Sequence, residues 1–156
     1  MQISEYFCWM IRLSFPAFNY KIKTEQSKEL IFDECRKQWV TLTPEEWVRQ
    51  NVLQYLAQTM QYPPSLIAVE KEINLGELKK RFDIVVYKNA KPWLMVECKE
   101  MNVPLNELVI RQILNYNIAL QVKYLVVTNG NATYALQIAG GVVVWLDNLP
   151  QYDSHP

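Results

Sequence analysis

Three consecutive segments in the middle of the chain have the length and the apolar content of β-strands, and the last of them has one apolar face and one face that turns charged at its end. They are LIAVEKEINL (66–75), RFDIVVYK (81–88) and KPWLMVECKE (91–100), separated by the short runs GELKK and NAKP. Because short polar connections join antiparallel neighbours, these three segments are expected to pair with one another. A fourth apolar run, KYLVVT (123–128), stops at the turn NGN and predicts a short buried strand.

Two segments of helix length flank the three strands. TLTPEEWVRQNVLQYLAQTM has Thr43 before Pro44 and Glu46 three residues after Thr43, a capping box that predicts a helix through about Met60. VPLNELVIRQILNYNIALQ (103–121) is the second. The order helix, three antiparallel strands, helix, strand indicates an α/β sandwich, with a mixed β-sheet flanked by helices.

Hairpins are expected at both ends of the chain. AFNYKIK and LIFDE flank the polar run TEQSKE near the N-terminus, and TYALQIAGGVVVWL turns around Gly140 and Gly141 near the C-terminus. No repeat or low-complexity linker divides the chain. We therefore expect a single domain over 1–156, composed of an N-terminal extension and hairpin (1–40), a core (43–130) and a C-terminal hairpin and tail (131–156).

Two acids are expected to meet across the hairpin of RFDIVVYK and KPWLMVECK. With its turn centred on Ala90, Asp83 faces Glu97 with Cβ atoms roughly 5 Å apart. At that distance, and at an effective dielectric constant near 20, two carboxylates repel by about 3 kcal/mol, so one acid protonates or a cation lies between them. Lys99 follows on the same face. Two acids and a lysine fit a Mg²⁺ site acting on a phosphodiester, whereas the alternative is a solvated Glu–Lys pair on a half-exposed strand.

The second predicted helix carries a glutamine and a tyrosine one turn apart, Gln112 and Tyr116. A glutamine within an apolar stripe needs a hydrogen-bond partner. Either Gln112 bonds to backbone while Tyr116 packs in the core, or both lie at the metal site and the nucleic-acid backbone. The stripe that they are expected to share consists of Leu105, Leu108, Val109 and Ala119.

Further charged residues lie close to these acids in the sequence. Glu70 is either a third acid at the metal site or, with Glu72, part of a solvated strand face. The basic run of Lys79, Lys80 and Arg81 precedes Asp83 and either grips phosphates near the site or forms a solvated loop.

Composition adds few constraints on partners. The 156 residues are half hydrophobic and 21% charged, with a formal net charge of zero, so nucleic-acid binding must come from a local patch. Cys8, Cys35 and Cys98 are odd in number and far apart, which suggests reduced thiols in a cytoplasmic protein, without a disulfide or a zinc site. No apolar run is long enough to span a bilayer, so no membrane partner is expected.

The ordered set Asp83, Glu97-Cys98-Lys99 and Gln112-x-x-x-Tyr116 resembles the PD-(D/E)XK nuclease superfamily. The similarity is closer to the N-terminal nuclease domain of type I restriction enzyme R subunits, and closest to small stand-alone bacterial proteins built around that domain. The phrases LIAVEKEINLGELKKRFDIVVY, LMVECK, RQILNYN and KYLVVTNG carry it. It covers roughly residues 18–130.

The resemblance implies a restriction-endonuclease-like αβ core and Mg²⁺-dependent DNA cleavage, with Mn²⁺ as a substitute. Asp83 and Glu97 match the metal ligands, and Lys99 matches the lysine that activates or positions water. Gln112 and Tyr116 match the element that supports the site and contacts DNA. Phe82 stands where the name of the motif has proline.

Two residues of the first predicted helix bear on this resemblance. Glu46 occupies a place where many nucleases of the superfamily carry a first-helix glutamate, but the capping box accounts for it and we favour the cap. Arg49, one turn later, is either a partner for a nearby acid or part of a solvated face.

The length of the chain shapes the functional hypotheses. Type I R subunits attach this domain to an ATP-driven motor, and 156 residues leave no room for one, so no translocation is expected. The first hypothesis is a Mg²⁺-dependent deoxyribonuclease with DNA as partner. The second is a non-cleaving DNA-binding or adaptor module that acts with other restriction or repair subunits. A dimer is compatible with either hypothesis.

Overall fold

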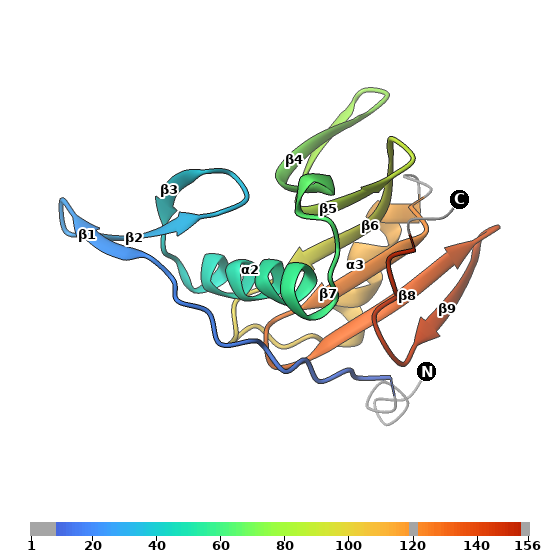
Figure 1. Ribbon diagram of the computed structural model, residues 1–156. Coiled ribbons are helices and arrows are strands. Elements are labelled where there is room, and N and C mark those ends of the chain that lie inside the picture. The colour runs from blue at the N-terminus through green and yellow to red at the C-terminus, as the bar shows by residue number, and fades with distance from the viewer. Residues whose placement is uncertain (1–8, 119–121, 154–156) are drawn as a thin grey trace.

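The computed structural model describes residues 9–118 and 122–153 and has an α/β fold around a mixed six-stranded sheet (Figure 1). The strand order is β4-β5-β6-β7-β8-β9, and only the neighbours β6 and β7 are parallel. The predicted mixed sheet and the antiparallel pairing of its first three strands are therefore confirmed. The strands are β4 (Ile67–Leu75), β5 (Leu78–Lys88), β6 (Lys91–Cys98), β7 (Tyr124–Thr128), β8 (Thr133–Ala139) and β9 (Val142–Leu146).

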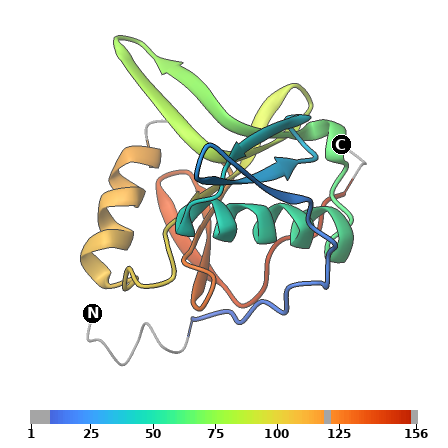
Figure 2. The ribbon, with the colours of Figure 1, turned by 90° about the vertical axis from the view of Figure 1, so that its left-hand side faces the viewer.

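One helix packs on each face of this sheet (Figures 1 and 2). On one face, Val52 of the first helix packs with the sheet residues Ile84 and Val96. On the other, Ile113 of the second helix packs with Met95. Both faces of the central strands are therefore buried, as in a three-layer α/β arrangement. The two helices are α2 (Pro44–Gln54) and α3 (Glu107–Ile118).

The start of α2 follows the capping signal in the sequence. Thr43 is extended and its Oγ1 accepts a hydrogen bond from the Glu46 N–H at 3.0 Å, while Pro44 is the first helical residue. The helix continues through the π-helical turn η1 (Tyr55–Thr59), which confirms its predicted extent. A short 3₁₀ turn, η2 (Pro64–Leu66), then leads into β4.

The second helix begins later than the sequence pattern suggested. Asn106 precedes α3, and its Oδ1 accepts from the Val109 N–H at 3.0 Å while its carbonyl accepts from Ile110 N–H at 3.1 Å. A polar side chain that satisfies the free N–H groups of the first turn is a helix N-cap. The helix therefore begins at Glu107 rather than near 103, and residues 119–121 lie outside the described part of the chain.

The face that α3 buries differs from the predicted stripe. Ile110, Ile113 and Asn117 are buried, at the spacing of one helical face, whereas Leu108 is 65% exposed and Gln112 is exposed. The expectation that Gln112 lies in an apolar stripe with Leu108 is wrong. The face of α3 that meets the sheet is that of Ile113, which packs with Met95.

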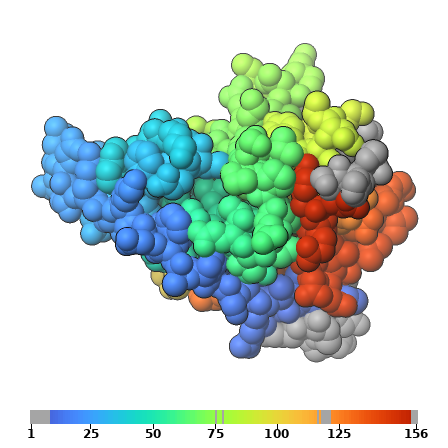
Figure 3. Space-filling view, in the orientation of Figure 1, coloured from blue at the N-terminus to red at the C-terminus, as the bar shows by residue number. Residues whose placement is uncertain are grey.

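The expected N-terminal hairpin is present, as part of a three-stranded antiparallel sheet. Gln26 and Ser27 both have positive φ, 50° and 62°, and form a two-residue turn inside the run that was expected to be a longer loop. The third strand is short and mostly exposed, so alternation did not reveal it. This sheet projects beside α2 (Figure 3). Its strands are β1 (Ile22–Glu25), β2 (Lys28–Asp33) and β3 (Gln38–Thr41).

The C-terminal hairpin is confirmed. β8 and β9 pair across Gly140 and Gly141, whose φ values of 56° and 78° cost glycine little. At the other end of the sheet, β5 begins at Leu78, so the basic run 79–81 lies in a strand, and its interpretation as a loop is wrong.

The described residues also bear on the membrane and thiol predictions. None of their helices is both long and apolar enough to cross a membrane. Cys35 and Cys98 are free thiols, as predicted, and Cys8 lies outside the described residues.

Candidate active site

Asp83 and Glu97 lie together at the end of the β5–β6 pairing. Ile84 pairs with Val96 in the register, so the next opposed positions are Asp83 and Glu97. Asp83 Oδ2 accepts a hydrogen bond from the Cys98 N–H at 2.8 Å. Burial raises the pKa of Glu97 to about 7, and the nearby charge of Asp83 adds to this effect. The structure therefore brings together the two acids that the register predicts to meet.

A change in the alternation of β5 turns Asp83 toward α2. Phe82 packs on the α3 side of the sheet, whereas Ile84 packs on the α2 side. Regular alternation would place both on one side, so the strand is irregular between them. Arg49 of α2 donates from Nη2 to Asp83 Oδ1 at 2.7 Å. The first acid thus has a cationic partner from the helix.

The Glu97 carboxylate has fewer hydrogen-bond partners than that of Asp83. Its Oε1 is buried without a hydrogen-bond partner, and the Lys80 ammonium lies 3.5 Å away, at the long end of an ion pair. Lys80 also lies over the Phe82 ring, 4.8 Å from its centroid. The cationic side chains Arg49 and Lys80 therefore offset the repulsion between the two acids, and the raised pKa of Glu97 favours its protonated form.

Lys99 follows the end of β6 and is half-buried. The backbone N–H of Lys99 donates a hydrogen bond to the Thr128 carbonyl at 2.8 Å. This bond continues the pairing of β6 with β7. Burial and the charge of Asp83 raise the pKa of Glu45, whereas the charges of Arg49 and Lys99 act in the opposite direction. The charges of Lys99 and Asp83 therefore both influence the pKa of the Glu45 carboxylate.

The structure places Glu70 among arginines. Its backbone has a φ of 51°, unusual within a strand, and its carboxylate lies 3.3 Å from Arg36, 3.6 Å from Arg49 and 3.8 Å from Arg81. Within the described ranges, no group of three or more His, Cys, Asp or Glu side chains is arranged to hold a metal ion. The role of Glu70 as a metal ligand stays a prediction.

The remaining predicted DNA contacts are placed only in part. Lys79 and Arg81 are exposed on β5, and Gln112 is exposed on α3. Tyr116 lies in α3, but its side chain is outside what the structure describes. Their roles stay predictions.

The sequence reasoning missed a buried ionic network beside the acid pair. The carboxylate of Glu46 accepts hydrogen bonds from Arg36, Arg49 and Gln50. Asp33, which is fully buried, accepts from Arg36 at 2.6 Å and from Gln50 at 2.9 Å. The interpretation of Glu46 as a cap is therefore wrong for its side chain, whereas Arg49 has the acidic partner that one interpretation gave it.

A signal in the helix could have revealed part of this network. Glu46, Arg49, Gln50 and Leu53 follow the spacing i, i+3, i+4 and i+7 of one helical face, and all four are buried. Three polar residues on a core-facing stripe must bond to one another or to other buried groups. No comparable pattern marks Arg36, which lies between two strands.

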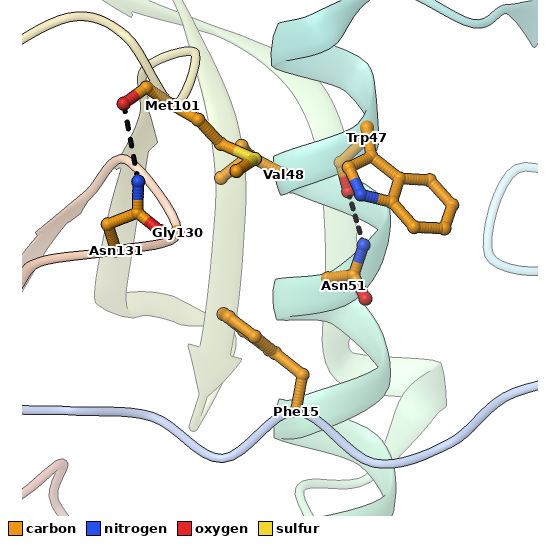
Figure 4. A pocket seen from close by; sticks show the side chains of 7 residues that line it. All are labelled: Phe15, Trp47, Val48, Asn51, Met101, Gly130 and Asn131. Carbon is orange, nitrogen blue, oxygen red and sulfur yellow. Dashed lines mark hydrogen bonds between the residues drawn. The ribbon is translucent and has the colours of Figure 1, made fainter.

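A cleft of about 210 Å³ lies beside α2 (Figure 4). Trp47 and Met101 line it and also line a neighbouring hollow of about 360 Å³. The residues that line the two hollows include none of the predicted site residues. The remaining residues of the first cleft are Phe15, Val48, Asn51, Gly130 and Asn131.

Residues 44–150 match the sequence profile of the family described as the type I restriction enzyme R protein N terminus. The chain belongs to this family. The match includes both helices and all six strands of the large sheet and leaves out β1, β2 and β3. Comparison with curated proteins and with solved structures gave no match. Membership of this family suggests a nuclease-related role for the chain.

Proposed function

We propose that this protein is a Mg²⁺-dependent deoxyribonuclease whose core is a restriction-endonuclease-like fold of the PD-(D/E)XK superfamily. The observation that carries the proposal is the meeting of Asp83 and Glu97, two residues before Lys99, in a chain of this family. An acid pair with a raised pKa is costly to the folded protein, and such costs are concentrated at functional sites.

The residues present fit a divalent metal ion. Mg²⁺ usually takes one or two protein carboxylates and keeps several waters, so Asp83 and Glu97 are a sufficient donor set. Glu97 Oε1 is buried without a hydrogen-bond partner, with only the Lys80 ammonium 3.5 Å away, so it has a lone pair to offer a metal ion. Asp83 uses one lone pair of each oxygen, toward Arg49 and Cys98, and has others left.

Each residue has a distinct role in the proposal. Asp83 and Glu97 hold Mg²⁺, or Mn²⁺ in its place, and the bound metal polarises the phosphodiester and makes its bound water more acidic. Lys99 orients the attacking water or stabilises negative charge on the phosphate. Exposed Lys79 and Gln112 contact the DNA backbone, together with Tyr116.

A second candidate function is a non-cleaving DNA-binding or adaptor module. Arg49 and Lys80 neutralise the two acids without any metal, which favours this alternative. The formal net charge of zero also gives no general attraction to DNA. In this case the fold would act only with partner proteins.

Incubation of the purified protein with supercoiled and linear DNA separates the two candidates. Reactions contain Mg²⁺, Mn²⁺ or a chelator, and compare wild type with Glu97→Gln and with Glu72→Gln, an exposed glutamate of β4. Metal-dependent cleavage that Glu97→Gln abolishes and Glu72→Gln retains supports the nuclease. Salt-sensitive DNA binding without cleavage, equal in all three proteins, supports the adaptor.

A further inference from the structure

The segment after β2 carries an arginine whose orientation is fixed by its own neighbours. Asp33 Oδ1 accepts hydrogen bonds from the N–H groups of Cys35 at 2.7 Å and Arg36 at 2.8 Å, which closes the turn. Asp33 Oδ2 accepts from Arg36 Nε at 2.6 Å. Asp33 therefore holds the Arg36 guanidinium by its Nε, and the two terminal nitrogens are left to bond to other acids.

Those two nitrogens reach acids on two different elements. Arg36 Nη2 donates to Glu46 Oε1 of α2, and Nη1 lies 3.3 Å from Glu70 Oε2 of β4. The other oxygen of Glu46 accepts from Arg49 Nη1. Arg49 Nη2 in turn donates to Asp83 at 2.7 Å. A continuous series of charged hydrogen bonds thus runs from Arg36 through Glu46 and Arg49 to Asp83.

Burial makes this series sensitive to the loss of one member. The side chains of Glu46 and Arg49 are each only 6% exposed, and that of Arg36 is 14% exposed. Arg49 lies between Glu46 and Asp83, so the position of its guanidinium depends on how strongly each acid holds it. Without Arg36, one oxygen of Glu46 loses its charged donor, and Glu46 competes more strongly for Arg49.

We propose that Arg36 is a positioning residue for the acid pair: it holds Glu46 so that Arg49 stays on Asp83. The proposal rests on the proposed nuclease function and adds that the three-stranded N-terminal sheet, outside the family match, completes the active site. A guanidinium is required because three donors in a fixed plane serve Asp33, Glu46 and Glu70 at once, which a lysine ammonium cannot do.

Three variants test this role. Arg36→Ala removes the guanidinium, Arg36→Lys keeps the charge without the planar fork, and Lys37→Ala removes a neighbouring exposed cation that pairs only with Glu34 among the described residues. Circular dichroism and urea unfolding establish that each variant is folded. If Arg36→Ala does not fold, Arg36→Lys decides the question.

Two measurements report on positioning. The first is Mn²⁺ affinity, followed by the electron paramagnetic resonance of free Mn²⁺. The second is the NMR signal of the Arg49 side-chain Nε–H, assigned by its loss in Arg49→Lys. We expect both Arg36 variants to bind Mn²⁺ about 10-fold or more weakly and to shift the Arg49 signal. Added guanidinium at a non-denaturing concentration should restore the Mn²⁺ affinity of Arg36→Ala, whereas urea should not. Lys37→Ala should bind Mn²⁺ as wild type does.

The outcomes separate this inference from the proposed function. If folded Arg36 variants keep the Mn²⁺ affinity and the Arg49 signal of Lys37→Ala, the positioning role is overturned while the nuclease stands. If wild type neither binds Mn²⁺ nor cuts DNA, the nuclease fails. In that case, a shift of the Arg49 signal in the Arg36 variants still supports positioning of Asp83, and an unchanged signal overturns it.

Discussion

Replacing Glu97 by glutamine should change how stability depends on pH. Burial and the charge of Asp83 raise the pKa of Glu97 from 4.5 to about 7 in the folded protein. Between these values the folded state binds more protons than the unfolded state, so the free energy of unfolding falls as pH rises. The stabilising proton is present below about pH 4.5 and is lost as pH rises through about 7.

The size of the effect follows from the pKa change. One pKa unit corresponds to about 1.4 kcal/mol, so the full change amounts to about 3 kcal/mol, of which about 2.5 kcal/mol falls between pH 5 and 8. Glu97 is only 9% exposed, so solvent screens this effect little. Because Asp83 and Glu97 interact, the proton belongs to the pair rather than to one residue.

Urea unfolding followed by tryptophan fluorescence, in the presence of a chelator, measures this dependence. Glu97→Gln should gain about 2.5 kcal/mol relative to wild type between pH 5 and 8, because a neutral amide has no proton to lose. Glu72→Gln, at an exposed position, should follow wild type. Parallel curves for wild type and Glu97→Gln would refute the raised pKa of Glu97 that burial and Asp83 produce. Excess Mg²⁺ should stabilise wild type more at pH 8 than at pH 6, since metal binding needs ionised carboxylates.

Other substitutions test separate parts of the structure. Thr43→Ala removes the N-cap of α2 and should lower the free energy of unfolding by about 1 kcal/mol, measured by urea unfolding, with little change in Mn²⁺ affinity. Arg49→Met leaves Glu46 and Asp83 buried without their shared partner and should destabilise the protein by about 3 kcal/mol or more, also by urea unfolding; a loss below 1 kcal/mol would contradict the ionic network. Lys99→Met should lower the single-turnover cleavage rate by about 100-fold with Mn²⁺ affinity nearly unchanged, since Lys99 is assigned to the water or phosphate rather than to the metal.

The sequence was informative where one local rule decides the geometry. The predicted β5–β6 register, which places Asp83 opposite Glu97, is correct at the acids, although the hairpin turns at Asn89 and Ala90 and reaches that register through a shift between Val86 and Tyr87. Thr43 before Pro44 located the start of α2, and two adjacent glycines located the last hairpin. These features depend on residues that are near one another in the chain or joined by a short connection.

Prediction failed where contacts between distant segments decide. Gln26 and Ser27 adopt positive φ although neither is glycine, so the first hairpin has a tighter turn than the sequence signals. Arg36 and Glu46 meet across separate elements, and no periodic pattern includes both. The stripe through Gln112 was wrong because the inward face of α3 is set by the sheet on which the helix packs.

Anomalous diffraction from crystals soaked in Mn²⁺ is the most direct test that Asp83 and Glu97 form a metal site. We expect one strong peak with carboxylate oxygens of both residues about 2 to 2.2 Å away, and none in crystals of Glu97→Gln. A peak that touches neither acid, or no peak while Arg49 and Lys80 remain on the two carboxylates at saturating Mn²⁺, would contradict the proposed nuclease site.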